Sequence, residues 1–493
     1  MDSIFNYPLV TSVLAALLLV GIVGKFLKFS FEKITRWYLY VAVLAVAVVM
    51  DSIFFPFIGG KDWFFRFSTE LALISAVMWW AFEARAGEVK QLITTTYKKP
   101  LVIAVTIFVV AFLLACVFAL DIHAAFWSNF ERGEGGFQMI HYYLFFMLLV
   151  MFMKDEADWK NLFRFSLVAA GLMIGYGLLG NFMVGGFIGP YAGGGAPTTG
   201  WFHVLIDGRF QGSLGNPAYV APYLMFAIFF AAWLWLSTKR DKSNANLAAW
   251  GYSLLIVAFL FFFMLTQTRG ALLGLVLGIV ALLLYFAFTG SPRAKKWTAA
   301  VALLLIVLGI GAYAERNSAF VQKLPEGRLL QLSASDYTAQ TRFWVWQEAW
   351  KGFLERPVFG WGPENFTAVY DKFFDPRFYV PGQNTETWFD RAHSVYFDYL
   401  SETGIVGLLA YLSIFATFFW EFFRRRNLHK RAEHGGTTTL LRGALLAMPI
   451  AYLVQGAAIF DVFPMYLCLF TFLGFATYYF SVHRREDVTA NAN

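Results

Sequence analysis

Runs of about 20 apolar residues recur along almost the whole chain, and each is long enough to cross the hydrocarbon core of a bilayer. They predict about thirteen spans, near residues 8–24, 37–58, 67–83, 101–120, 138–153, 165–188, 217–237, 249–265, 270–289, 297–314, 396–420, 439–460 and 464–481. Only 14% of the 493 residues are charged, too few to cover a large soluble core. The sequence therefore predicts an all-α, polytopic transmembrane helical bundle.

Short clusters of basic residues separate the apolar runs. With thirteen alternating spans they all fall on one side of the membrane, near residues 25–36, 85–99, 239–242, 293–296 and 424–431, together with Arg484 and Arg485 in the tail. The positive-inside rule makes that side the cytoplasm. We therefore expect an outer N-terminus and a cytoplasmic C-terminus. The net charge of +7 reflects this topology, and we expect no nucleic-acid partner.

One long polar interruption divides the chain. Residues 1–314 carry the first ten predicted transmembrane helices, 315–395 form a large extracytoplasmic loop, and 396–493 carry the last three helices and a cytoplasmic tail. Within the loop, residues 341–354 have the spacing of an amphipathic helix with an aromatic face: Phe343, Trp346, Trp350 and Phe353. Tryptophans on such a helix favour a membrane interface, so we expect this helix on the outer surface of the bundle.

Three basic residues lie at the outer starts of predicted spans. Arg209 precedes the seventh span, Arg269 opens the ninth and His393 opens the eleventh. Asn216 followed by Pro217 is a good helix start, and Thr268 is placed to cap the ninth span in the same way. Helix N-termini carry partial positive charge. Together with the two arginines, they predict a cradle for an anion such as a lipid diphosphate. The alternative is that these arginines only extend to lipid headgroups.

His393 is the best candidate for a general base, because neutral imidazole accepts a proton at physiological pH. Asp390, three residues earlier, is placed to orient the ring. The alternative is a structural histidine at a helix start. Further candidates for substrate binding are Asn216, Gln267, Arg342, Asp390 and Arg391. The two cysteines lie inside apolar runs, and no outward pair of carboxylates has metal-ligand spacing, so we expect neither a metal nor another cofactor.

Three blocks resemble the O-antigen ligase and polymerase family of bacterial membrane glycosyltransferases. The first is Arg209-Phe-Gln-Gly212-Ser-Leu-Gly-Asn216-Pro217, and the second is Thr268-Arg269-Gly270 before a helix rich in leucine and glycine. The third runs from Thr341-Arg342 through Pro357-Val-Phe-Gly360-Trp-Gly362 to His393-Ser394, and ends in Leu400-Ser-Glu402-Thr-Gly404-Ile-Val-Gly407-Leu. The resemblance covers roughly residues 165–420.

The resemblance implies a GT-C-like bundle in the bacterial inner membrane with its active site facing the periplasm. It implies transfer of a glycan from undecaprenyl diphosphate to an acceptor hydroxyl without a metal. His393 would deprotonate the acceptor, and Arg209 and Arg269 would bind the departing diphosphate. The acceptor can be lipid A-core, a growing glycan or a protein, so ligase, repeat-unit polymerase and protein O-oligosaccharyltransferase stay open. A transporter of the lipid-linked glycan is the alternative outside this class, but we find no internal repeat to favour it.

Overall fold

The computed structural model describes residues 29–50, 52–53, 55–129, 132–179, 209–240, 245–318, 337–379, 387–424 and 436–492. Within these ranges the ordered elements are helices, with no strand: α2 Phe31–Ala42, η1 Val43–Ala47, α3 Gly59–Phe82, α4 Glu88–Tyr97, α5 Pro100–Val117, α6 Ile122–Trp127, α7 Gly136–Phe152, α8 Glu156–Leu179, η2 Gly212–Leu214, α10 Pro217–Arg240, α11 Ala245–Leu265, α12 Arg269–Thr289, α13 Pro292–Ala314, α15 Tyr337–Glu355, α16 Phe366–Phe373, η4 Pro376–Phe378, α17 Val395–Glu402, α18 Gly404–Arg424, α19 Gly436–Gly456 and α20 Phe463–Ala492.

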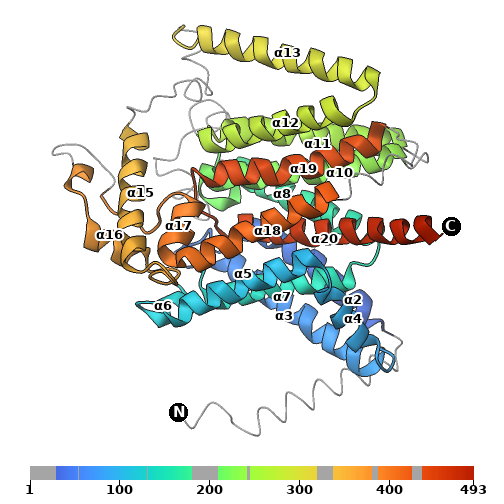
Figure 1. The fold of residues 1–493 in the computed structure, drawn as a ribbon, viewed down its shortest axis with the longest axis horizontal. Coiled ribbons are helices and arrows are strands. Elements are labelled where there is room, and N and C mark those ends of the chain that lie inside the picture. The colour runs from blue at the N-terminus through green and yellow to red at the C-terminus, as the bar shows by residue number, and fades with distance from the viewer. Residues whose placement is uncertain are drawn as a thin grey trace.

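Eight of the described helices are long and apolar enough to cross a membrane: α5, α8, α10, α11, α12, α18, α19 and α20. The apolar helix α7 is somewhat shorter. The long helices run side by side along one direction (Figure 1). The prediction of an all-α, multi-pass membrane bundle is therefore confirmed. The predicted first span, residues 8–24, and the glycine-rich stretch 184–200 lie outside the described residues.

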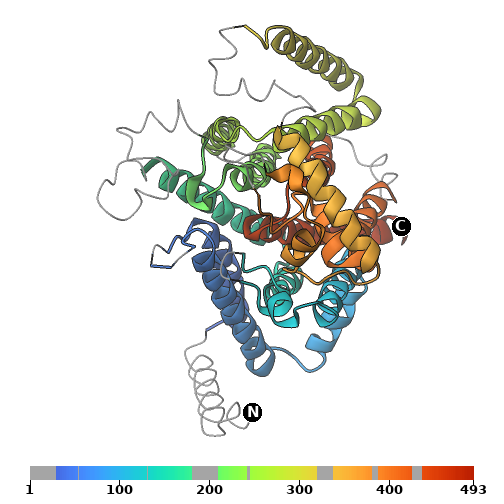
Figure 2. The same cartoon turned by 90° about the vertical axis from the view of Figure 1, so that its left-hand side faces the viewer.

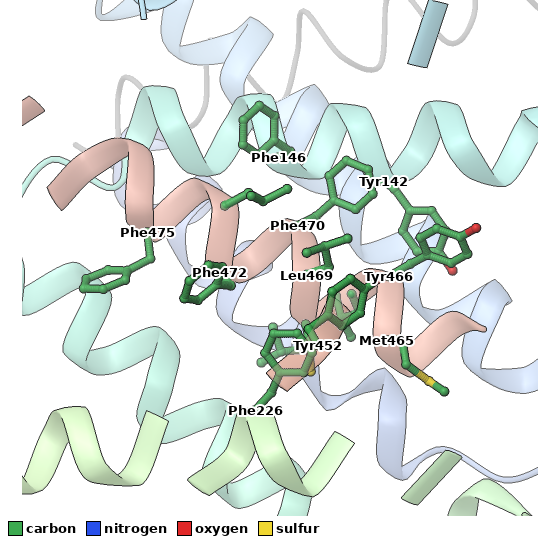
Figure 3. Packing of buried hydrophobic residues seen from close by; sticks show 14 of the residues in the cluster. Tyr142, Phe146, Phe226, Tyr452, Met465, Tyr466, Leu469, Phe470, Phe472 and Phe475 are labelled. Atoms are coloured by element: carbon green, nitrogen blue, oxygen red, sulfur yellow. The ribbon is translucent and has the colours of Figure 1, made fainter. Parts of the chain in front are cut away.

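The centre of the bundle is formed by α10 and α20. In these helices 83% and 78% of the spanning window is buried, against 17% in α11 and in α12. Aromatic side chains fill the space between α20 and its neighbours (Figure 3). Tyr142 of α7 stacks on Phe470 of α20 with ring centroids 5.7 Å apart, and Phe226 of α10 packs against Tyr452 of α19. Such packing holds helices together where lipid removes the hydrophobic driving force.

Close approach of α12 to α19 and to the loop that follows it depends on three glycines spaced four residues apart. A Cβ atom on Gly274 would lie 2.5 Å from the Ala451 carbonyl oxygen, and one on Gly270 would lie 2.7 Å from the Ala458 Cβ. Gly278 faces Ala451 at 3.0 Å in the same way. Small residues at this spacing allow membrane helices to pack backbone against backbone. The start of α12, where Arg269 lies, is thereby fixed against the loop that follows α19.

The two ends of the bundle differ. Helices α6, α15, α16 and α17 gather at one end, whereas α4 and the C-terminal end of α20 lie at the other (Figure 1). Helix α15 crosses in front of the bundle when it is viewed from that first end (Figure 2). It buries Val345 and Ala349 in a small second core, while Phe343 and Trp350 are each 48% exposed. The helix predicted over 341–354 is present, and its exposed aromatic residues suit a membrane interface.

Two predicted spans differ in detail from the structure. The span 37–58 is wrong in its second half: the helical segment ends at Ala47, and the described residues among 48–58 contain no helix. The backbone carbonyl groups that are left without helical partners there accept hydrogen bonds from other parts of the protein, because lipid offers no partner. The Ser213 hydroxyl donates to the Val46 carbonyl oxygen, and the Lys61 ammonium donates to the Val48 carbonyl oxygen. The span 396–420 is two helices, α17 and α18, which meet at Thr403 and Gly404.

The break between α17 and α18 yields a prediction about stability. Gly404 has φ +65°, and a Cβ atom there would lie 2.3 Å from the Val358 carbonyl oxygen. Gly87 also has positive φ, +81°, but faces open space. Both Gly→Ala variants incur the left-handed backbone penalty of about 1–2 kcal/mol, and Gly404→Ala adds an overlap with backbone. We expect thermal unfolding in detergent to show Gly404→Ala as the less stable variant by about 2 kcal/mol or more. Equal losses would contradict this packing.

Candidate functional site

His393 lies just before α17, with a backbone that is unusual for its residue type. Its φ is 55°, in the left-handed region that costs non-glycine residues free energy and is often found at functional sites. Gln267, another predicted site residue, has φ 50°. The imidazole of His393 is nearly perpendicular to the rings of Phe389 and Phe460, whose centroids lie 5.4 and 5.2 Å from its own. Contacts with these two aromatic rings therefore restrict the orientation of the imidazole.

The hydrogen bond of His393 fixes its tautomer. Its Nδ1 lies 3.2 Å from the Arg391 carbonyl oxygen, which can only accept, so Nδ1 carries the proton and Nε2 keeps a lone pair. Burial lowers the pKa of His393 to about 4; the Arg391 carbonyl and Asp390 raise it, whereas Arg342 and Arg132 lower it. The ring is therefore neutral at physiological pH, as a base must be before it accepts a proton.

Asp390 does not hydrogen-bond to the imidazole, whose partner is the Arg391 carbonyl oxygen, so it does not orient the ring by direct contact. Its carboxylate accepts two hydrogen bonds from Arg132, from Nε at 2.5 Å and Nη2 at 2.9 Å. This ion pair is nearly buried, with the two side chains 13% and 11% exposed. It holds the pKa of Asp390 below its usual value against the opposing effect of burial. Arg132 belongs to the predicted outer loop between spans four and five and was not among the predicted site residues.

Arg391 lies in the interior, where its guanidinium is bound by carboxylates. Its Nη1 lies 2.8 Å from the Glu402 Oε2, and its Nη2 contacts Glu364. The side chain of Arg391 is 8% exposed, and those of Glu364 and Glu402 are 2% and 5% exposed. The two carboxylates raise the pKa of Arg391 and so keep the guanidinium charged despite burial. Arg391 is thus placed to hold the loop rather than to meet a ligand.

Two parts of the third sequence block lie directly against each other. The backbone of Trp361 and Gly362 donates hydrogen bonds to the Ser401 and Glu402 carbonyl oxygens, at 2.9 and 2.8 Å. Across the break, Ile405 donates to the Pro357 carbonyl oxygen at 2.9 Å. This pairing satisfies backbone groups at the end of α17 that no helix can satisfy. It anchors the segment after α15 to the helix that begins beside His393.

Arg209, in the segment before α10, contacts the turn between α11 and α12. Its Nε donates to the Thr266 carbonyl oxygen at 2.9 Å, and its Nη2 donates to the Thr268 hydroxyl at 3.3 Å. Thr268 does not cap α12 with its side chain, contrary to expectation; its hydroxyl instead donates to the carbonyl oxygens of Pro217 and Thr266. The first two sequence blocks are therefore joined at the starts of α10 and α12.

The predicted helix start at Asn216 is present. Its side-chain oxygen accepts a hydrogen bond from the Ala218 N–H at 2.8 Å, which satisfies one unpaired donor at the beginning of α10. Arg269 is the first residue of α12 and is partly exposed. Gln267 is also partly exposed, in the turn beside it. Arg342 lies on α15 and acts electrostatically on His393.

The three helix starts meet around the loop between α19 and α20. Phe460 of this loop contacts the His393 imidazole. Its ring centroid lies 6.0 Å from that of Tyr219, in the first turn of α10. The Arg132 guanidinium carbon lies over the Phe460 ring, 5.1 Å from the centroid. Ile459 accepts a hydrogen bond from the Val395 N–H at the start of α17, at 3.1 Å. Gly270 packs on Ala458 at the start of α12. The sequence offered no signal that this loop would be the common centre.

Val395 of α17 and Phe460 line a small cavity of ≈ 20 Å³, room for about one water molecule. Four carboxylates line it beside Arg391: Glu134, Asp398, Glu402 and Asp461. Neither oxygen of Glu134 has a hydrogen-bond partner among the described residues, and burial together with nearby Asp62 raises the pKa of Glu134 well above its usual value. Among the described residues, no three histidine, cysteine or acidic side chains are arranged to hold a metal ion.

Glu134 provides a test of this electrostatic picture. The pKa of Glu134 is higher in the folded than in the unfolded protein. The free energy of unfolding that Glu134 contributes is therefore complete at low pH, and it is lost as the pH rises above the pKa in the unfolded protein, about 4.3. Glu134→Gln mimics the protonated acid at every pH. We expect its melting temperature to exceed that of the wild type at pH 8 and to equal it near pH 4.5.

Glu364→Gln is the matched control for Glu134→Gln, because it removes a partner of buried Arg391. It should lower the free energy of unfolding at pH 8 by about 3–5 kcal/mol. If Glu134→Gln also lowers the melting temperature at pH 8, the Glu134 carboxylate is ionised and stabilised by an opposite charge.

Comparison with protein families identifies one segment. Residues 254–412 match the family model described as O-antigen ligase, about a third of the chain. The match contains Arg269, Arg342 and His393, whereas the block around Arg209 precedes it. No curated protein matches the chain. The resemblance inferred from the sequence is therefore confirmed over residues 254–412, which are similar to the O-antigen ligase family.

Proposed function

We propose that the protein is a glycosyltransferase that moves a glycan from undecaprenyl diphosphate to an acceptor hydroxyl at the outer face of the bacterial cytoplasmic membrane. One observation carries this proposal. The imidazole of His393 and the α12 start with Arg269 both pack against the loop between α19 and α20, and Arg209 is bound to the turn before Arg269. A neutral base and two cations thus flank one loop at one end of the bundle.

The proposed reaction assigns each residue a step. The acceptor hydroxyl attacks the anomeric carbon of the donor glycan and gives its proton to Nε2 of His393. The bond between that carbon and the diphosphate oxygen breaks, and the electron pair stays on the diphosphate. Arg209 and Arg269 stabilise the charge that develops there, with the N-terminus of α12. The products are undecaprenyl diphosphate, the glycosylated acceptor and an imidazolium that returns its proton to water.

The membrane arrangement belongs to the same proposal. Residues 1–314 and 396–493 form the membrane part, and 315–395 form the extracytoplasmic loop. The end with α6, α15, α16 and α17 then faces the periplasm, and the opposite end, with α4 and the C-terminus of α20, faces the cytoplasm (Figure 1). Basic α4 residues such as Lys90 support this orientation. The partners are the lipid-linked donor, a glycan, lipid or protein acceptor, and membrane lipids.

The test is transfer by the purified protein in the presence of EDTA, with synthetic undecaprenyl-diphosphate glycan and a panel of acceptors. We expect release of undecaprenyl diphosphate with formation of a glycosylated product. The acceptor that reacts distinguishes an O-antigen ligase from a repeat-unit polymerase or a protein O-oligosaccharyltransferase. If no acceptor reacts but the intact lipid-linked glycan crosses proteoliposome membranes, the protein is a transporter and the proposal is wrong.

Substitution of the proposed residues should abolish transfer. Loss of a group that stabilises the developing charge costs about 3 kcal/mol or more, so His393→Ala and Arg269→Ala should each lower kcat at least about 100-fold. Membrane insertion and donor-lipid levels should not change. The controls are His123→Ala on α6, an exposed histidine at the same end, and Arg377→Ala, an arginine 52% exposed in the outer loop. Near wild-type transfer by His393→Ala would overturn the assignment of the base.

The low pKa of His393 predicts two different pH profiles. In the free enzyme this pKa is about 4, so kcat/KM, which reports the free enzyme, should fall only as pH approaches that value. Bound diphosphate brings negative charge toward the ring and favours imidazolium. The acid limb of kcat, which reports the enzyme–substrate complex, should therefore lie at higher pH. Coincident limbs near pH 6.5 would mean that burial does not perturb the base.

A further inference from the structure

One buried guanidinium near the site has no part in the proposed reaction. Arg132 lies between α6 and α7, and its side chain is 13% exposed. It donates two hydrogen bonds to Asp390 and a third, from Nη1, to the Tyr219 hydroxyl at 2.8 Å. A planar guanidinium bound by a carboxylate in this bidentate manner is both strong and directional.

Arg132 joins the elements that carry the site. Tyr219 is in the first turn of α10, Asp390 is three residues before His393, and the face of Phe460 lies 5.1 Å below the guanidinium carbon. The ring of the same Phe460 lies 5.2 Å from the His393 imidazole between centroids, and the two ring planes are 88° apart. Through Asp390 and Phe460, Arg132 therefore holds both the chain that leads to His393 and the ring that packs against it.

The backbone at His393 needs such support. A histidine with φ 55° persists only where its surroundings over-determine its conformation, because that region costs about 1–3 kcal/mol. The charged groups that act on the imidazole come from three elements: Arg132 from the loop between α6 and α7, Arg342 from α15 and Asp390 from its own segment. Arg132 and Asp390 act in opposite directions on the pKa of His393, so loss of Arg132 removes one of the effects that lower this pKa, while burial and Arg342 still lower it.

We propose that Arg132 is a positioning residue for glycan transfer, which holds the His393 imidazole in place relative to the start of α10 through Asp390 and Phe460. This inference rests on the proposed function, in which His393 is the base. A purely structural ion pair would contribute to stability alone. A positioning role also sets the rate of the chemical step and the acid–base behaviour of His393.

The experiment compares Arg132→Lys and Arg132→Gln with the wild type in the transfer assay. Lysine keeps the charge but cannot form the bidentate contact, so kcat should fall about 100-fold, as for small misplacements of a reacting group, with donor KM little changed. Arg132→Gln should lose kcat to a similar extent, and the acid limb of its kcat/KM should move to higher pH. Only monodisperse protein after size exclusion is assayed.

Arg36→Gln is the matched control. Arg36 donates to both carboxylate oxygens of Asp158 at 3.0 Å, and the Tyr40 hydroxyl donates to the same carboxylate at 3.3 Å. Its helix, α2, lies away from the end that carries α15 and α17 (Figure 1). This variant should lose stability but keep the kcat and the pH profile of the wild type.

A second measurement does not depend on catalysis. Diethyl pyrocarbonate modifies neutral imidazole, and mass spectrometry of the peptide that contains His393 gives the pH midpoint of modification. The midpoint should rise in Arg132→Gln and stay unchanged in Arg36→Gln. If both Arg132 variants keep the wild-type kcat and midpoint while His393→Ala is inactive, the inference is wrong and the proposed function stands. If the wild type transfers no glycan, the proposed function fails, and the midpoint alone decides whether Arg132 acts on His393.

Discussion

The buried ion pairs of Arg391 hold together the part of the protein that differs most from a simple helical bundle. An isolated charge in such a place is very unfavourable, so the guanidinium requires both Glu364 and Glu402. Glu402 is the last residue of α17 and Glu364 follows the turn after α15. Their shared partner therefore fixes the loop to the helix. The backbone pairing of residues 357–362 with 401–406 completes the junction, and His393 lies two residues beyond Arg391.

The sequence predicted the helices well because apolar length is a direct consequence of bilayer thickness. The prediction from the sequence was wrong where residues distant along the chain form the hydrogen bonds of backbone groups. Near the helix end at Ala47, the Ser213 hydroxyl donates a hydrogen bond to the free Val46 carbonyl oxygen. The break at Gly404 depends on Val358 and Pro357, which lie beside it. These partners are far along the chain, and no local pattern shows them. The two halves of an apolar run therefore looked like one span.

The candidate site could be predicted only in part for a similar reason. Residues at helix starts, such as Asn216 and Arg269, follow from capping chemistry and the alternation of spans. Asp390 could not be assigned from its spacing to His393, because its true partner, Arg132, is 258 positions away. Arg132 itself had one weak signal, its place between charged and glycine residues just before a span. Phe460 had none, since a phenylalanine beside an apolar run is ordinary.

The glycine contacts of α12 have a consequence for how the protein meets lipid. Membranes differ in thickness, and a single helix follows such differences by tilting or sliding. Helix α12 cannot slide alone, because Gly274 and Gly278 fit against α19 and Gly270 fits against the loop that follows it. Arg269 at its first residue is therefore held at a depth set by protein contacts. The depth of Arg269 should stay constant when the bilayer thins or thickens, and the lipid must adjust to the protein.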